Sequence, residues 1–474
     1  MKNDAPLVAE EKQLTKRGRK PTTFEAVMAM LFIIVVILSS IKIELVLETA
    51  MVLGTLAAAI FGFYLHYTWD DIQNGMLDGI NNGLTACIIL IVIGMVVGTW
   101  ILGGTIQTLI YYGLRILTPQ IFLPIAFLIC ALTSVLIGSS FGTIATMGIV
   151  LMGVAKGLNF PAALTAGAIA SGSIFGDKVS PLSDSTNLTA AITETDLFSH
   201  VCSMLYVSGP AALITFALYW IIGQSHVSVA TDWGAVNNIL AALESNFNIS
   251  PLTLLPPLLV IILSVLKIPA IVALMISYLT AALFAVITQG ASLGDIITVS
   301  ASGFVSNTGL DVVDRLLTQG GINSMMSTVA IIMAATAMGG ILEKCGVLEV
   351  ILNALMHYIK TPRGLILASL GSAYLMLIAC GEMMASIILP GRTFRPAYKE
   401  MNIDTSVLSR TLESAATLGC MALPWGVASV YLQKVLNVGL EYIPYTFISL
   451  IAPIFVIIYA FTGFATWTDK NTQN

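Results

Sequence analysis

The sequence predicts an all-α polytopic membrane protein with about 11–13 membrane segments in two repeats, interrupted by broken or re-entrant helices. The chain is 57% hydrophobic and only 10% charged, with a mean hydropathy of +0.91, whereas soluble domains have about 25% charged residues. Many windows of about 20 apolar residues are long enough to cross a hydrocarbon core of about 30 Å. Polar, glycine-rich stretches interrupt several of these windows.

The same composition argues against several other classes of protein. No basic face with interleaved aromatic residues is present, so nucleic-acid binding has no support. The six cysteines and four histidines are scattered without the spacing of metal ligands, and we expect no cofactor.

The chain begins with a polar, basic stretch that is followed at once by an apolar run. That run, residues 24–41, is too long for the hydrophobic region of a signal peptide, so we expect an uncleaved first helix. The basic residues before it place the N-terminus in the cytoplasm. The expected units are a tail at 1–23, a first transmembrane helix at 24–44, a first repeat at 45–223, a polar loop with a connecting helix at 224–267, a second repeat at 268–466 and a tail at 467–474.

Apolar segments and polar connectors then alternate along the chain. The expected apolar segments are 45–67, 84–117 with an interruption at Gly103-Gly104, 121–156, 160–194, 198–223, 252–266, 268–288, 326–359, 365–390, 405–436 and 443–466. The polar stretches are an amphipathic or irregular connector at 70–83, a loop at 224–250 with a surface helix at 234–245, and 289–325. We expect 121–156 to be a broken helix or a re-entrant hairpin, because its centre is too polar for a plain span.

The two halves of the chain resemble each other at an offset of 243 residues. Between 84 and 119, nine of 36 positions are identical at this offset, where roughly one in ten is expected between unrelated apolar helices. The offset then slips by two, which places Gly138–Phe141 over Ala379–Glu382, and later returns to 243 to pair Pro181 with Pro424. Paired breaks in corresponding segments point to a binding site at the midplane of a secondary transporter. The sequence leaves open whether the repeats are inverted.

The stretch from Ser171 to Asn187 is the most polar one at expected membrane depth. Asp177 and Asp184 are two helical turns apart, and Pro181 unwinds the segment between them. Freed carbonyls, carboxylates and hydroxyls are hard oxygen ligands of the kind that suits Na⁺, and we place Na⁺ at Asp177 and Asp184. The candidate cation- or proton-binding residues are Asp177, Ser180, Ser183, Asp184, Ser185, Thr186, Asn187, Glu413 and Thr417. Lys178 either neutralises Asp177 in a helix-end pair or competes with Na⁺ for it.

The second half carries its own charged residues at membrane depth. Glu382 lies inside an apolar segment, and Glu413 and Thr417 share a helix face before the break at Pro424-Trp425-Gly426. The candidate substrate- or pore-lining residues are Ser139, Ser140, Thr143, Glu382, Ser414 and Trp425. Arg392, Arg395 and Lys399 belong either to a solvated loop or to an anionic vestibule.

Several of these strings resemble the NhaC family of Na⁺/H⁺ antiporters, within the broader ion-transporter superfamily. The similarity covers about residues 24–465 and is carried by Gly138–Thr143, Ser171–Asn187 and Leu408–Tyr431. It implies a multi-span protein of the bacterial inner membrane with repeated halves that exchanges Na⁺ for H⁺, while some relatives move malate and lactate or amino acids. The chain departs from the family pattern at Glu382-Met383, where a Gln-Tyr-like pair is common, at Ser414-Ala415, where the family commonly has Asp-Ser, and at Gly426, where Asn is usual.

We therefore expect a secondary transporter, and no enzyme, that couples Na⁺ and H⁺ in opposite directions by alternating access. Asp177 and Asp184 would supply the cation site, and Glu413 or Glu382 would supply protonation. The alternative within transporters is coupled movement of a small organic acid or amino acid. An ion channel is the alternative from another class, against which stand the broken repeats and the absence of a filter sequence. The expected partners are Na⁺, H⁺ and membrane lipid, and a homodimer is compatible with the chain.

Overall fold

The computed structural model describes residues 18–42, 46–116, 119–181, 183–230, 233–266 and 268–467. Within these ranges the chain is helical, and its extended pairing is limited to one isolated bridge between Phe304 and Gln319. Six of the described helices are long and apolar enough to cross a membrane, and shorter apolar helices accompany them. The all-α fold class is confirmed.

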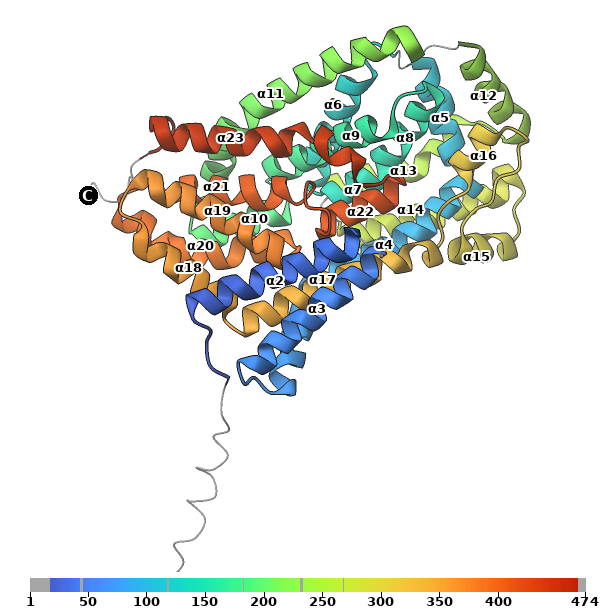
Figure 1. Ribbon diagram of the computed structural model, residues 1–474. Helices are drawn as coiled ribbons and strands as arrows, with labels where there is room; N and C mark the ends of the chain where they lie inside the picture. Colours follow the sequence, from blue (N-terminus) through green and yellow to red (C-terminus); the bar gives the residue numbers. More distant parts are fainter. Residues whose placement is uncertain are drawn as a thin grey trace, which may run out of the picture.

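The helices follow the order shown in Figure 1. They are α2 (Thr23–Lys42), α3 (Leu47–Tyr64), α4 (Trp69–Leu102), α5 (Thr105–Ile116), α6 (Phe122–Ile137), α7 (Ser140–Thr143), the π-helical η2 (Ile144–Gly148), α8 (Ile149–Gly157), α9 (Ala162–Val179), α10 (Asp184–Thr193), α11 (Leu197–Ala230), α12 (Trp233–Asn246), η3 (Pro251–Leu254), α13 (Leu255–Val265), α14 (Ala270–Gln289), α15 (Leu293–Ser302), α16 (Asp311–Leu317), α17 (Ile322–Lys344), α18 (Val347–Tyr358), α19 (Pro362–Cys380), α20 (Met383–Glu400), α21 (Thr405–Gly419), α22 (Val427–Leu436), η4 (Leu440–Tyr445) and α23 (Phe447–Thr462).

The prediction of a separate connector at 70–83 is wrong, because this polar stretch is the first part of the 34-residue helix α4. A capping box starts the helix, with the Thr68 hydroxyl accepting from the Asp71 amide and the Asp71 carboxylate accepting from the Thr68 amide. Glycines four residues apart then form a flat face on which α17 packs: a Cβ at Gly79 would lie 2.1 Å from the Thr336 carbonyl oxygen. The stretch is polar because part of it faces a cavity instead of lipid.

The repeat holds at 243 residues through both hairpin regions, so the predicted slip of two residues is wrong. Gly138 and Gly381 end α6 and α19 in the left-handed conformation, and the residues after them, Ser139 and Glu382, cap the helices that follow. Left-handed backbone is what glycine supplies at a helix end, and it fixes these two positions as equivalent. The predicted slip matched small residues near the two tips and missed that Gly138 and Gly381 share the same helix-ending conformation.

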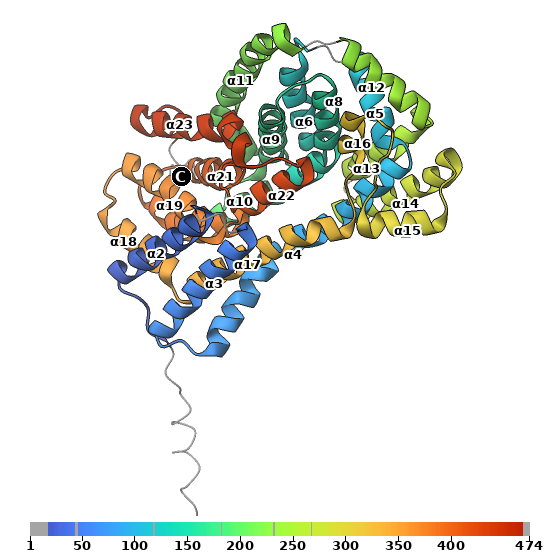
Figure 2. The ribbon, with the colours of Figure 1, turned by 45° about the vertical axis from the view of Figure 1, so that its right-hand side comes forward.

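The two repeats have inverted topology. The equivalent helices α4 and α17 lie side by side (Figure 1, Figure 2). They run antiparallel, because Gly79 meets Thr336 and Gly340 while Gly94 meets Gly321. Within each repeat the packing has the same register: Gly176 of α9 rests on Ala131 and Ser134 of α6, and 243 residues later Gly419 of α21 rests on Tyr374 and Leu377 of α19. A sequence-related pair of helices that crosses antiparallel is the arrangement expected for inverted repeats.

Each repeat contains a hairpin and a broken helix. In the first repeat α6 runs to the tip at Gly138-Ser139, α7, η2 and α8 return, and α9 then runs parallel to α6. In the second repeat α19 and α20 meet at Gly381-Glu382, so the segment 365–390 is broken at this tip. The broken helices are α9–α10, interrupted around Pro181 as predicted, and α21–α22, interrupted between Gly419 and Val427.

Candidate functional site

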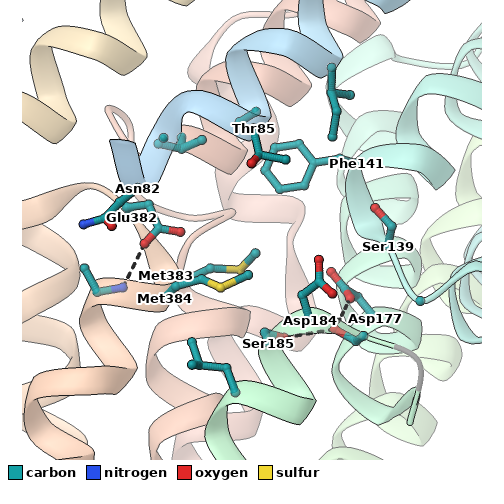
Figure 3. Close-up of a pocket in the computed structure, with 18 of the residues that line it drawn as sticks. Asn82, Thr85, Ser139, Phe141, Asp177, Asp184, Ser185, Glu382, Met383 and Met384 are labelled. Carbon is teal, nitrogen blue, oxygen red and sulfur yellow. Dashed lines mark hydrogen bonds between the residues drawn. The ribbon is translucent and has the colours of Figure 1, made fainter. Parts of the chain in front are cut away.

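The hairpin tips, the first broken helix and α4 meet around one cavity of about 340 Å³ (Figure 3). Its lining includes Ser139 from the first tip, Glu382 from the second tip, and Asp177 and Asp184 from the two sides of the helix break. Residues more than 200 positions apart in the sequence thus line the same cavity. No Lys, Arg or His belongs to the lining among the described residues.

Asp177 is held in place by donors from two directions. Its side chain is 3% exposed, and one carboxylate oxygen, Oδ2, accepts from both the amide (3.0 Å) and the hydroxyl (2.6 Å) of Ser140 at the hairpin tip. The other oxygen, Oδ1, accepts from the hydroxyl of Ser183 in the helix break at 2.6 Å. Charge-assisted bonds of this length stabilise an ionised carboxylate and fix its orientation. The tip of one hairpin and the break of one helix are therefore joined through this carboxylate.

Asp184 begins α10, and its accessible carboxylate lies toward that of Asp177 at the cavity wall. Ser183 and Ser185 line the same wall, with their hydroxyl oxygens 3.1 Å apart. Carboxylate and hydroxyl oxygens grouped in this way can replace the hydration shell of a hard cation. This group of oxygens is the candidate cation site.

The other hydroxyl and amide residues of the stretch shape the helix break and do not belong to the cavity lining. The Ser180 hydroxyl donates to the Val135 carbonyl at 2.7 Å, and the Thr186 hydroxyl to the Lys178 carbonyl at 3.0 Å. The Asn187 amide donates to the carbonyls of Pro181 and Ser183. Because backbone freed by a break must be satisfied inside a membrane, these bonds hold the unwound segment open.

Lys178 turns away from Asp177 and toward the second repeat. It is fully buried, and its ammonium donates to the Ser414 hydroxyl of α21 at 2.8 Å. The expected helix-end pair with Asp177 is wrong, because no ion pair within 4.0 Å joins Lys178 to Asp177 among the described side chains. The carboxylate that attracts this ammonium is Glu413, also on α21. Its oxygens lie more than 4.0 Å from the Lys178 nitrogen.

Glu413 is fully buried and connects to the cavity through α10. Its Oε1 is 2.9 Å from the Thr189 hydroxyl, which is also 2.7 Å from the Ser185 carbonyl. Its Oε2 has no hydrogen-bond partner among the described residues. The chain of contacts from Glu413 through Thr189 and Ser185 to Ser183 ends at Asp177. The helix α10 therefore connects Glu413 to the candidate cation site through hydrogen bonds.

The remaining predicted residues hold the second repeat and the first tip together. Trp425 donates from its indole nitrogen to the Ile378 carbonyl at 3.0 Å and does not line the cavity. Thr417 is fully buried one turn beyond Glu413, and the Thr143 hydroxyl returns to the Ser139 carbonyl at 3.0 Å. Thr143 is followed at once by the π-helical turn η2, a feature often found next to functional sites.

Several lining residues were not predicted from the sequence. They are Asn82 and Thr85 of α4, Phe141 after the first tip, and Met383 and Met384 after the second. The glycines at 75, 79 and 83 could have indicated that Asn82 lies on a packed helix instead of a connector, because they recur every four residues. The methionines and Phe141 look like ordinary core residues, and only the meeting of the two tips places them at a cavity.

A second cavity of about 660 Å³ adjoins the first and shares Asn82, Ala385 and Ile388 with it. It is lined by the charged residues Asp78, Glu343, Lys344 and Arg392. Arg392 thus belongs to a mixed-charge vestibule. This vestibule lies where α4 begins and α17 ends, the side on which Lys20 of the N-terminal segment pairs with Glu349 at 2.8 Å.

The sequence profile of the Na⁺/H⁺ antiporter family matches residues 2–186 and 172–464. The chain belongs to this family. It is 36% identical over 447 residues to the Na⁺/H⁺ antiporter NhaC of Alkalihalophilus pseudofirmus, covering 94% of this chain and 96% of that protein. It is also 36% identical over 458 residues to the malate-2H⁺/Na⁺-lactate antiporter of Bacillus subtilis, covering 96% and 98%. A third relative is the arginine/ornithine antiporter ArcD of Halobacterium salinarum, with 37% identity over 401 residues, covering 84% and 82%.

Family membership confirms the resemblance found in the sequence strings and, with the apolar helices, a multi-pass protein of the cell membrane. These relatives are named for different substrates but are almost equally similar to this chain, so identity alone does not select among their activities. The selection has to come from the chemistry of the cavity.

Proposed function

We propose that the protein exchanges Na⁺ for H⁺ across the cell membrane by alternating access. The proposal is carried by one observation: Asp177 is buried where a hairpin tip meets a helix break, beside Asp184 and serine hydroxyls, at a cavity without a basic side chain among the described residues. Two named NhaC Na⁺/H⁺ antiporters at 36% and 34% identity support the same activity.

In this proposal Na⁺ binds to the carboxylates of Asp177 and Asp184 with hydroxyl oxygens of the helix break as further ligands. Carboxylates in a partly dehydrated site need a compensating cation or a proton, since an uncompensated charge at membrane depth is costly. Na⁺ and H⁺ can therefore replace each other at this site. Glu413 holds a proton in the return step, and Thr189 and α10 connect its charge to the cation site.

Inverted repeats supply the alternating access. The cavity adjoins the vestibule on the side of the N-terminal segment, which we assign to the cytoplasm because of its basic residues. Exchange of the two repeat conformations would open the same site to the other side of the membrane. The structure described here then corresponds to the form open toward the cytoplasm.

An organic anion such as malate or lactate fits the cavity less well. Three carboxylates and no basic side chain, among the described residues, would repel an anion unless a bound cation intervened. The composition of the cavity thus favours a cationic cargo, although a relative of equal similarity carries the name of a malate–lactate exchanger.

The test is a lumenal pH measurement in proteoliposomes after addition of NaCl or KCl. We expect Na⁺ to change the lumenal pH, and we expect Asp184→Asn to abolish this response while the protein still inserts. Losing one ionic ligand worth about 3 kcal/mol corresponds to roughly a 100-fold loss of affinity. Asp70→Asn is the matched control, because Asp70 is an exposed carboxylate at the start of α4 outside the cavity. Wild-type exchange in Asp184→Asn would remove that residue from the site, and no response to Na⁺ in the wild type would refute the function.

A further inference from the structure

The two repeats place unlike chemistry at equivalent positions. At the offset of 243 residues, Asp177 corresponds to Cys420 and Asp184 to Val427. Conversely, the cavity-lining acid of the second repeat, Glu382, corresponds to Ser139. The first repeat therefore carries its cavity-lining carboxylates on the broken helix, and the second carries its cavity-lining carboxylate on the hairpin tip.

The hydroxyl groups are distributed just as unevenly. Ser140, which donates to Asp177, corresponds to Met383, and Ser183 corresponds to Gly426. The wall built by the second tip thus offers one carboxylate and two thioether side chains, with no set of hydroxyl ligands. Na⁺ prefers several hard oxygen ligands, so this wall is poorly suited to a second Na⁺.

Glu382 is a buried carboxylate that no cationic side chain neutralises. Its side chain is 7% exposed and lines the cavity, and its Oε2 accepts from the Ala385 amide at 2.8 Å. No basic group of the described residues lies within 4.0 Å of it. Burying an ionised carboxylate without a countercharge costs several kcal/mol. A cation delivered from outside the protein would remove that cost.

The space beside Glu382 is larger than a metal ion requires. The cavity volume of about 340 Å³ lies in the range of small-molecule sites, which is roughly 300–1,000 Å³. Met383 and Met384 lie between Glu382 and the carboxylates of the first repeat, and Phe141 lies opposite them (Figure 3). Thioether and aromatic surfaces bind methylene groups and, for the ring, also cations. The chamber is therefore acidic at both ends and apolar between them.

We propose that this cavity binds a small aliphatic ammonium compound, with an amino group on Glu382 and its carbon chain against Met383, Met384 and Phe141. The proposal rests on the function proposed above, because it names this compound as a second cargo of the same cavity, one that competes with Na⁺ for the carboxylates of the first repeat. A diamine matches the chamber best, since carboxylates lie at both ends. A carboxylic acid lacks a complementary partner on either wall.

The test uses radiolabelled putrescine in proteoliposomes loaded with unlabelled putrescine, measured without Na⁺ and compared with protein-free liposomes. This counterflow signal does not depend on lumenal pH. We expect uptake at least tenfold above the protein-free vesicles and a loss of roughly tenfold in Glu382→Gln, since removing one charge-assisted contact is worth about 1.4 kcal/mol or more. Glu400→Gln, an exposed carboxylate at the end of α20 outside both cavities, is the matched control and should leave counterflow unchanged.

The same preparations are tested for the Na⁺-driven pH response, which separates the two proposals. One outcome overturns the ammonium site and leaves Na⁺/H⁺ exchange standing: Na⁺ changes the lumenal pH, putrescine shows no counterflow, and putrescine does not inhibit the pH response. Putrescine counterflow without a Na⁺ response supports the ammonium site and refutes the exchange. Undiminished counterflow in Glu382→Gln, or counterflow of lactate or malate in place of putrescine, also overturns the ammonium site.

Discussion

The buried ammonium of Lys178 and the buried carboxylate of Glu413 offer the sharpest test of how the repeats are coupled. Both side chains are fully buried, they come from different repeats, and each interacts electrostatically with the other. We predict that Lys178→Met and Glu413→Gln each destabilise the protein strongly, because each leaves one charged group buried without compensation. Such a loss is about 3–5 kcal/mol in other proteins.

The structure sets the size of the coupling between them. The nitrogen and oxygen atoms are farther apart than 4.0 Å, and two unit charges at 4 Å interact by about 4 kcal/mol at an effective dielectric constant of 20. The loss of unfolding free energy in the double variant should therefore be smaller than the sum of the two single losses by about 1–4 kcal/mol. Removing both charges also removes the desolvation cost that each single variant keeps.

The assay is unfolding of the purified protein by titration with a denaturing detergent, followed by tryptophan fluorescence, for the wild type, both single variants and the double variant. The exposed pair Lys20–Glu349, changed to Met and Gln in the same cycle, is the matched control and should show a smaller coupling, because solvent screens it. Additivity of the Lys178 and Glu413 losses within about 0.5 kcal/mol would refute the reasoning.

Two further predictions concern packing and pH. Gly176→Ala should destabilise the protein by about 2 kcal/mol or more in the same titration, because its Cβ would lie 2.2 Å from the Ala131 carbonyl oxygen; Gly371→Ala, where a Cβ meets nothing within 4 Å, is the control, and equal effects of the two would contradict the close helix contact. At the end of α10, the Lys399 hydrogen bond and then the Arg395 charge hold the pKa of the Glu194 carboxyl below its usual range. A lowered pKa means that this contact is present above the unfolded pKa of about 4.3 and is lost only as pH falls through the lower folded value. Glu194→Gln should therefore leave the shape of the exchange profile between pH 6 and 9 unchanged, and a shifted midpoint in that range would show that Glu194 titrates there.

Inside the site, the sequence identified the carboxylates but not their partners. Asp177, Asp184 and Glu382 could be recognised because charge at membrane depth is rare and expensive. Thr189 and Phe141 could not, because a threonine or phenylalanine in an apolar helix has many structural roles. The helix-end pair expected for Lys178 was also wrong, since its neighbour in sequence is Asp177 but its hydrogen-bond partner in space is Ser414.

The sequence by itself determined the membrane fold, the repeat and the polar breaks. These properties follow from local composition and from matching positions along the chain, such as Pro181 and Pro424. Only the tertiary structure decided that the repeats are inverted, that 70–83 belongs to α4, and that Glu382 faces the carboxylates of the first repeat across a cavity. The physical reason is that helix direction and the meeting of two hairpin tips depend on glycine contacts between distant segments, as between Gly79 and Thr336, which no local pattern encodes.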